Sequence, residues 1–347
     1  MAVTIKDVAR ESGVNVSTVS RALNGEYGVH PDTREHVAAV ARRLRYRPNR
    51  VARGLVTGRS HTLALVVSDI RNPFFAEVAR GAEDAAYRAG YDLVLCNSDL
   101  DAEKQMRYAQ SLMEKRVDGI LMNSVAALSK KQQEQLAGLG VPIVLLNRAA
   151  PRGAFSTVCA DNEAGGALAA EYLLKLGHRK IAHLTGPRHH GNMTERAKGF
   201  VARLAAARKP VRPVVLYGKN DFPGGMELAR KLMALHPDIA AVFAASDMMA
   251  FGAIRALLEA GRRIPQDVSV MGFDNVELAS IVHPPLTTIH QPKYEIGHAA
   301  VEILLRLARR GEHQAPEHRL FGVALMERQS CASCRAATRY PLGRERP

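Results

Sequence analysis

Residues 4–25 read TIKDVARESGVNVSTVSRALNG, and this stretch decides the fold of the N-terminal part of the chain. Thr4 suits a helix N-cap, and Gly13 ends the helix that follows because glycine accepts a positive φ. Asn15 caps a second short helix, which ends before Gly25. Two short helices joined by a tight turn predict a helix-turn-helix, whose second helix is sized for a DNA major groove.

A third helix is expected from about Pro31, a residue favoured at the first helical position. Val37, Val40 and Leu44 recur along it at helical spacing and close a small core. Ordinary three-helix bundles share this pattern, so periodicity alone leaves the function open.

Positive charge is concentrated in the same region. Lys and Arg number 48 against 34 Asp and Glu, a formal net charge of +14. Residues 1–60 hold 11 basic and 5 acidic residues. Such an excess favours a polyanionic partner, and its position points to nucleic acid.

From His61 the pattern changes to short apolar runs that alternate with longer amphipathic stretches. This alternation is typical of parallel sheets covered on both faces by helices. About ten such units would make one very wide sheet, so we expect two doubly wound subdomains. The clearest strands are residues 63–67, 93–96, 119–122, 143–146, 181–184, 242–245 and 268–273.

Candidate ligand-binding residues follow these strands, because ligands of doubly wound folds bind beyond the carboxyl ends of the strands. The positions combine aromatic rings, guanidinium groups and carboxylates, the mixture that sugar hydroxyls and sugar C–H faces need. Asp247 is expected to be a helix N-cap instead. The positions are residues 69–75, Asn147, Arg148, Arg196, Phe222, Ser246 and residues 272–275.

The order of residues resembles the lactose/galactose repressor family of bacterial transcriptional regulators. The matches lie at 4–9, 13–14, 17–21, 23–25, 33–34 and 46–49, and continue at 264–270 and 285–292. The resemblance implies an all-α helix-turn-helix headpiece and an α/β core, like that of periplasmic binding proteins, of two doubly wound parallel-sheet subdomains. It also implies a repressor of carbohydrate-utilisation genes that binds a pseudo-palindromic operator as a homodimer and responds to a sugar-like effector.

The domain boundaries follow from the same resemblance. We expect the headpiece at 1–47, a hinge helix or linker at 48–60 and the core at 61–328. The N-subdomain is expected at about 61–160 plus 291–328 and the C-subdomain at about 161–290. A disordered basic tail is expected at 329–347, where Cys331 and Cys334 lie in a solvated segment. Cys96 and Cys159 end apolar runs and are expected to be buried free thiols.

Site residues are also implied position by position. Val16 and Ser17 would read base edges, and Leu55 would wedge into the minor groove. The full DNA-binding set is Thr4, Lys6, Val16, Ser17, Thr18, Arg21, Asn49, Ala52, Arg53 and Leu55. The effector set comprises ring contacts by Phe74, Phe75 and Phe222, bonds to oxygens from Arg148, Arg196, Asp274 and Gln291, and lesser contacts from Asn72 and Ser246.

Other classes of protein fit less well. We find no GxSxG, Walker A, GxGxxG or HExxH motif, so we expect neither an enzyme nor a cofactor or metal site. The basic headpiece and the absence of a secretory signal or membrane span oppose a periplasmic binding protein and favour the cytoplasm. A purine-responsive regulator of the same family remains an alternative. Purine-type relatives carry an arginine where this chain has His190, which favours a sugar.

Overall fold

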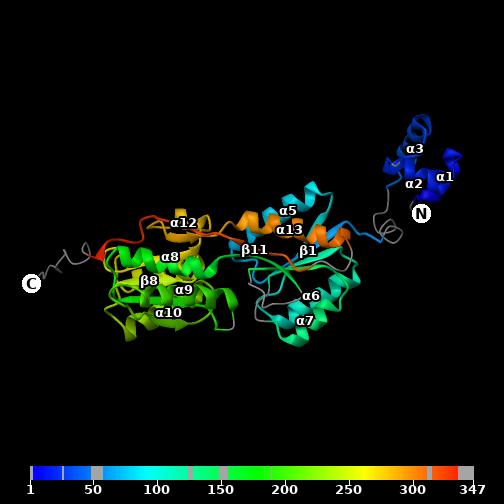
Figure 1. Ribbon diagram of the computed structural model, residues 1–347. Helices are drawn as coiled ribbons and strands as arrows, with labels where there is room; N and C mark the ends of the chain where they lie inside the picture. Colours follow the sequence, from blue (N-terminus) through cyan, green and yellow to red (C-terminus); the bar gives the residue numbers. More distant parts are fainter. Residues whose placement is uncertain are drawn as a thin grey trace, which may run out of the picture. The chain divides into compact units, whose positions relative to one another are not determined.

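The computed structural model describes residues 3–25, 27–47, 58–123, 128–147, 155–188, 190–310 and 315–334. The chain forms two compact units, residues 1–60 and residues 61–347, whose elements are labelled in Figure 1.

The first unit is a helical headpiece whose helix ends are set by capping residues. The backbone nitrogen and the hydroxyl of Thr4 donate to the carboxylate of Asp7 at 2.9 and 2.7 Å, which fixes the start of the first helix. Gly13 and Gly25 end the first two helices in the left-handed conformation, with φ of 67° and 72°. The helices are α1 (Ile5–Ser12), α2 (Val16–Asn24) and α3 (Pro31–Arg43), packed around Val8, Val19, Val37 and Val40.

The second unit is built on two sheets. The N-sheet has the order β11-β5-β4-β3-β1-β2, with every strand pair parallel. The C-sheet has the order β12-β10-β9-β8-β6-β7, and within the described residues β12 is its antiparallel strand. The strands are β1 (Thr62–Val67), β2 (Asp92–Asn97), β3 (Gly119–Asn123), β4 (Ile143–Leu146), β5 (Ser156–Ala160), β6 (Ile181–Thr185), β7 (Val214–Tyr217), β8 (Ala241–Ala244), β9 (Ser269–Asp274), β10 (Thr287–His290), β11 (His318–Phe321) and β12 (Ala324–Met326).

Helices cover these sheets, so central strands such as β3, β4 and β5 are buried along their whole length. This agrees with the continuous apolar runs in the sequence and confirms the expected fold class. In Figure 1 α5 and α13 lie side by side. The helices are α5 (Phe74–Arg88), α6 (Ala102–Glu114), α7 (Lys130–Ala137), α8 (Asn162–Lys175), α9 (Gly191–Ala205), α10 (Phe222–Leu235), α11 (Asp247–Glu259), α12 (Leu278–Ile281) and α13 (Lys293–Arg310).

Helices α8 and α9 pack backbone against backbone. A Cβ atom on Gly166 would lie 2.0 Å from the carbonyl oxygen of Arg196, and one on Gly199 would lie 1.9 Å from that of Glu163. Only glycine permits so close an approach. The backbone of Arg196 is therefore fixed against α8.

The expected assignment of residues 291–328 to the N-subdomain is wrong at its end. After β11 pairs with β5, the chain crosses back, and β12 pairs with β10 of the C-sheet. Leu325 packs against the apolar side chains of the C-sheet, such as Phe273 and Ile289. Local periodicity cannot reveal which distant strand a segment pairs with.

The predicted disordered tail is also wrong for residues 329–334. Ser330 is fully buried: its hydroxyl donates to the carbonyl of Val270 at 2.6 Å and accepts from the amide of Thr287 at 2.8 Å. The amide of Cys334 donates to the carbonyl of Leu176 at 2.9 Å. Residues 335–347 lie outside the described part of the chain.

The cysteines differ in environment from what the sequence suggests. The thiol of Cys331 lies 3.3 Å from a backbone carbonyl, and burial raises its pKa to about 12, so it is not in a solvated tail. Cys159 is buried, with a pKa raised to about 11 mainly by that burial. Cys96, expected to be buried, is half-buried on the edge strand β2.

Candidate functional site: headpiece surface and pocket

Helix α2 presents a polar outer face on the headpiece. Val16, Ser17 and Arg21 are exposed, whereas Val19 and Ala22 are buried against the other helices. This division places side chains suited to base and phosphate contacts on one side of a helix that its inner face holds in place.

Asn15 orders the start of this face. Its Oδ1 atom accepts hydrogen bonds from the backbone nitrogen of Thr18 at 2.8 Å and from the hydroxyls of Ser17 and Thr18 at 2.6 and 2.8 Å. One capping residue therefore holds the helix end and orients both hydroxyls.

The remaining predicted DNA-binding residues divide into two groups. Thr4 and Lys6 are exposed at the start of α1, and the hydroxyl of Thr4 is engaged with Asp7. Outside the described residues lie Asn49, Ala52, Arg53 and Leu55.

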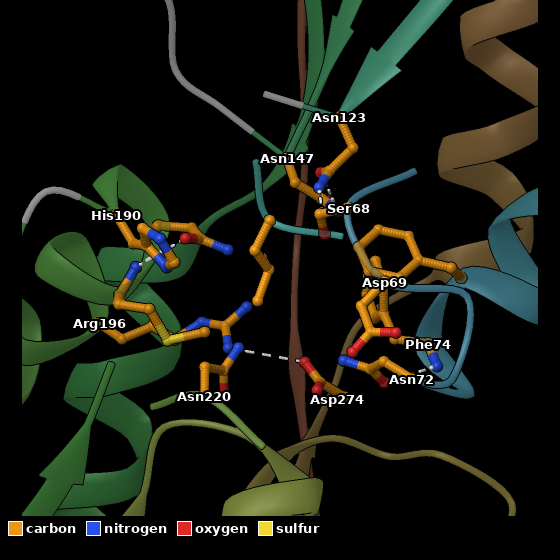
Figure 2. A pocket seen from close by; sticks show the side chains of 14 residues that line it. Ser68, Asp69, Asn72, Phe74, Asn123, Asn147, His190, Arg196, Asn220 and Asp274 are labelled. Atoms are coloured by element: carbon orange, nitrogen blue, oxygen red, sulfur yellow. Dashed lines mark hydrogen bonds and ion pairs between the residues drawn. The ribbon is translucent and has the colours of Figure 1, made fainter. Parts of the chain in front are cut away.

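A pocket of about 60 Å³ in the second unit lies at the carboxyl ends of strands from both sheets (Figure 2). Asn123 and Asp274 end β3 and β9, and Arg196 reaches the pocket from α9. The described lining is Ser68, Asp69, Asn72, Phe74, Phe75, Leu100, Asn123, Asn147, His190, Asn192, Met193, Arg196, Asn220 and Asp274.

Arg196 is only 3% exposed, and its guanidinium is held from several sides. Nε donates to Oδ1 of Asn162 at 2.9 Å, and Nη1 donates to the carbonyl oxygen of Ala245. The guanidinium carbon lies 3.7 Å from the centre of the Phe273 ring, and Nη1 lies 3.6 Å from Oδ1 of Asp274. No hydrogen bond to another described residue uses Nη2, which leaves its donors for a bound molecule.

Asp274 is the acidic counterpart, and its backbone has an uncommon φ of 118°. Its Oδ1 accepts from Nε2 of Gln291 at 2.6 Å. The ammonium of Lys293 donates to the carbonyl oxygens of Asp274 and Asn275, both at 2.9 Å, and so holds this strained segment. Burial raises the pKa of Asp274, although Arg196 and Lys293 oppose the shift.

Asp247 lies behind this pair and has a different role from the expected N-cap. Ser246 caps α11, accepting from the amide of Met249 at 3.3 Å. Asp247 instead accepts from the hydroxyl of Thr288 at 2.6 Å and from the amide of Val276 at 2.8 Å. Burial and the neighbouring carboxylate raise its pKa.

Amide side chains form the opposite wall. Nδ2 of Asn123 donates to the hydroxyl of Ser68 at 2.9 Å, and Nδ2 of Asn147 donates to Oδ1 of Asn123 at 3.2 Å. Oδ1 of Asn147 is buried and has no hydrogen-bond partner among the residues that the structure describes. A donor on a bound molecule would satisfy it.

The predicted effector residues divide by their position relative to the pocket. Ser246 and Gln291 are outside the described lining and donate hydrogen bonds to residues that form it, at 2.6 Å to Asn220 and at 2.6 Å to Asp274 respectively. Phe222 is half-buried at the start of α10, outside the described lining. Arg148 is not among the described residues. Asn72, Phe74, Phe75, Arg196 and Asp274 line the pocket, with the two phenyl rings edge to face at 5.1 Å.

Asp69 and Asn147, which were predicted as candidates after their strands, do line the pocket. Several other lining residues were not predicted. Ser68 directly follows β1 and Asn123 ends β3, so the same strand-end rule could have found these two. Leu100, Asn192, Met193 and Asn220 come from longer loops or from a helix, where strand position gives no signal.

Two further features bear on the class of protein. No helix of the described residues is long and apolar enough to cross a membrane. In the same residues, no group of three or more His, Cys, Asp or Glu side chains could hold a metal ion.

Comparison with known proteins identifies both units. Residues 4–49 match the family model of bacterial regulatory proteins of the lacI family, and residues 60–319 match that of periplasmic binding proteins and the sugar-binding domain of the LacI family. The chain is 37% identical to the ribose operon repressor of Escherichia coli K12 over 331 residues, 94% of this chain and 99% of the relative. It is 39% identical to the transcriptional repressor PurR of Vibrio cholerae over 320 residues, 92% of this chain and 94% of the relative.

Solved structures show the same likeness. The lac repressor dimer bound to operator matches with a TM-score of 0.85 and 28% identity, over 96% of this chain and all of that chain. A LacI-family regulator of Enterococcus faecium with bound ribose matches with a TM-score of 0.69 and 32% identity, over 78% of this chain and 99% of that one. The chain belongs to the LacI family of bacterial regulatory proteins and is a DNA-binding transcriptional regulator.

Proposed function

We propose that this chain represses carbohydrate-utilisation genes as a homodimer on a pseudo-palindromic operator, and that a monosaccharide of the ribose type binds its pocket and releases it from DNA. Because the operator is chromosomal DNA, the protein would act in the cytoplasm.

The observation that carries the proposal is the chemistry of the pocket. A buried guanidinium and a buried carboxylate, Arg196 and Asp274, face asparagine amides across a small cavity beside the Phe74 ring. Each sugar hydroxyl both donates and accepts a hydrogen bond, so it can pair with Arg196 Nη2, an Asp274 oxygen or Oδ1 of Asn147. The phenyl ring suits a C–H face of the sugar.

Relatives support a sugar as the effector. The matched Enterococcus faecium structure holds ribose, and the Escherichia coli relative is a ribose operon repressor. The lac repressor supports the DNA-bound dimer, since its structure is a dimer on operator.

On the headpiece, the exposed face of α2 supports base reading by Val16, Ser17 and Arg21, with Thr18 beside them. Thr4 and Lys6 at the start of α1 would meet phosphates.

A purine effector is the second candidate, favoured by the identity to PurR. The pocket argues against it. His190 lines the pocket, whereas the nearby Arg188 stacks on Tyr217 with its guanidinium carbon 3.9 Å from the ring centre. A guanidinium held by that ring is not offered to a purine.

Isothermal titration calorimetry on the full chain tests the proposal, with D-ribose, other pentoses, hexoses, hypoxanthine and guanine as ligands. We expect saturable binding of a pentose and none of the purines. Tight binding of a purine without binding of any sugar would identify the effector as a purine. If none of these ligands binds, the assignment of a sugar as the effector is refuted.

A further inference from the structure

Asn162 occupies the point where the chain leaves the N-sheet for the C-subdomain. It is the first residue of α8, two positions after Ala160, which ends β5. Its side chain is 2% exposed, so its polar atoms have to be satisfied within the protein.

The carboxamide of Asn162 joins the pocket to that crossover. Its Oδ1 accepts from Nε of Arg196 at 2.9 Å, and its Nδ2 donates to the carbonyl oxygen of Ala160 at 3.1 Å. Nδ2 also lies 3.3 Å from Oε2 of Glu195. One planar group therefore connects the buried guanidinium with the last residue of an N-sheet strand.

The surrounding backbone leaves Arg196 little freedom to move alone. The close contact between Gly166 and the carbonyl of Arg196 fixes α9 against α8, and the Phe273 ring lies against the guanidinium at 3.7 Å. The guanidinium is thus bonded through Nη1 to the carbonyl of Ala245, which directly follows β8 of the C-sheet, and through Nε to Asn162, which leads to the N-sheet.

We propose that Asn162 is the positioning residue that transmits occupancy of the pocket to the crossover between the two sheets. The inference rests on the effector role proposed above for Arg196. When a ligand engages Nη2, the guanidinium shifts, and Asn162 passes the shift to the carbonyl of Ala160 and so to the N-sheet. Removing the carboxamide uncouples ligand binding from the relative position of the subdomains.

Two variants test separately the two hydrogen bonds that form the carboxamide bridge, from Arg196 to Asn162 and from Asn162 to Ala160. Asn162→Ala removes both hydrogen bonds, whereas Asn162→Asp keeps an acceptor for Arg196 and loses the donor to the carbonyl of Ala160. The neighbouring Asp161→Ala is the matched control. It removes the N-cap of α8, where Asp161 accepts from the amide of Ala164 at 2.9 Å, and leaves the carboxamide bridge in place.

The measurement is the ratio of operator affinities without and with saturating D-ribose, together with the dissociation constant for D-ribose and the melting temperature. In wild type we expect a ratio of about 5 to 150, the usual range of allosteric coupling. Both Asn162 variants should bring the ratio close to one. Asn162→Asp should bind D-ribose nearly as tightly as wild type, and Asn162→Ala more weakly. Asp161→Ala should lower the melting temperature and keep the wild-type ratio.

The outcomes separate this inference from the proposed function. If wild type does not respond to D-ribose, the proposed function is at fault. If wild type responds and a folded Asn162 variant keeps the wild-type ratio, the carboxamide does not transmit the signal. A lowered ratio in Asp161→Ala equal to that of the Asn162 variants would reduce the effect to lost stability and overturn the inference.

Discussion

Arg196 and Asp274 are buried charges that depend on each other, since each is no more than 3% exposed. Removing one member of a buried pair leaves the other uncompensated, a cost of about 3–5 kcal/mol. We therefore expect Arg196→Ala and Asp274→Asn to lower the melting temperature and to abolish D-ribose binding in calorimetry. Operator binding below the melting temperature should persist.

The matched control is Arg203→Ala on the same helix. Arg203 pairs with Glu171 at 3.4 Å on the surface, where an ion pair contributes about 0–1 kcal/mol. It should leave both activities unchanged. Undiminished D-ribose binding in folded Arg196→Ala would exclude the guanidinium from the site.

The pH dependence of ligand binding follows from Asp274. Because burial raises the pKa of its carboxyl, the charge is lost at a higher pH than for an exposed aspartate. We expect the affinity for D-ribose, measured by calorimetry, to weaken as pH falls from about 7.5 to about 5.

Unfolding should not explain that loss. The folded protein holds the proton of Asp274 more tightly than the unfolded chain, so protonation of this group stabilises the fold over the same pH range. His190 also lines the pocket, and histidine ordinarily titrates in this range. His190→Asn should therefore keep the pH dependence. A flat affinity in wild type, or a dependence that disappears with His190, would contradict the role of Asp274.

At the scale of elements, the packing of α8 on α9 sets the position of Arg196. A methyl group on Gly166 would meet a backbone carbonyl at 2.0 Å, which no side-chain rotation can relieve. Overpacking costs about 1–3 kcal/mol or more, so Gly166→Ala should be strongly destabilised in chemical denaturation and should bind D-ribose poorly. Gly191→Ala, also on α9, meets nothing within 4 Å and should behave like wild type. Equal stability of the two variants would show that the helices do not approach as described.

Arg21 on α2 and Lys6 on α1 are expected to contact different parts of the DNA. Arg21→Ala removes an exposed guanidinium from α2 and should cost about 1–3 kcal/mol of operator affinity if it reads a base. Lys6→Ala should weaken specific and random DNA alike and reduce the slope of log affinity against log salt by about 0.9. Mobility shifts at several salt concentrations distinguish the two. Equal losses on operator and random duplex in Arg21→Ala would assign that residue to the phosphate backbone.

The sequence predicts elements well where local chemistry decides them. Thr4, Gly13, Asn15 and Gly25 bound the first two headpiece helices, and the seven apolar runs all form strands. Prediction from the sequence fails where residues far apart in the chain determine strand pairing or burial. The pairing of β12 with β10 and the burial of Ser330 depend on contacts across about 40 to 60 residues.

The pocket shows the same limit. Arg196 on α9 and Asp274 at the end of β9 could be recognised because charges placed in a cleft need partners. Gln291 and Ser246 were placed in direct contact with the ligand, but in the structure they orient Asp274 and Asn220 instead. A sequence names the residues near a site, whereas three-dimensional packing decides which of them face it.

The whole molecule combines a basic helix-turn-helix headpiece with a core for which we propose a sugar ligand. The most direct test is the affinity of the full chain for an operator selected from genomic fragments, measured by fluorescence anisotropy with and without saturating D-ribose or hypoxanthine. We expect D-ribose to weaken operator binding by about 5- to 150-fold and hypoxanthine to have no effect. Operator affinity that hypoxanthine changes and D-ribose leaves unchanged would contradict this expectation.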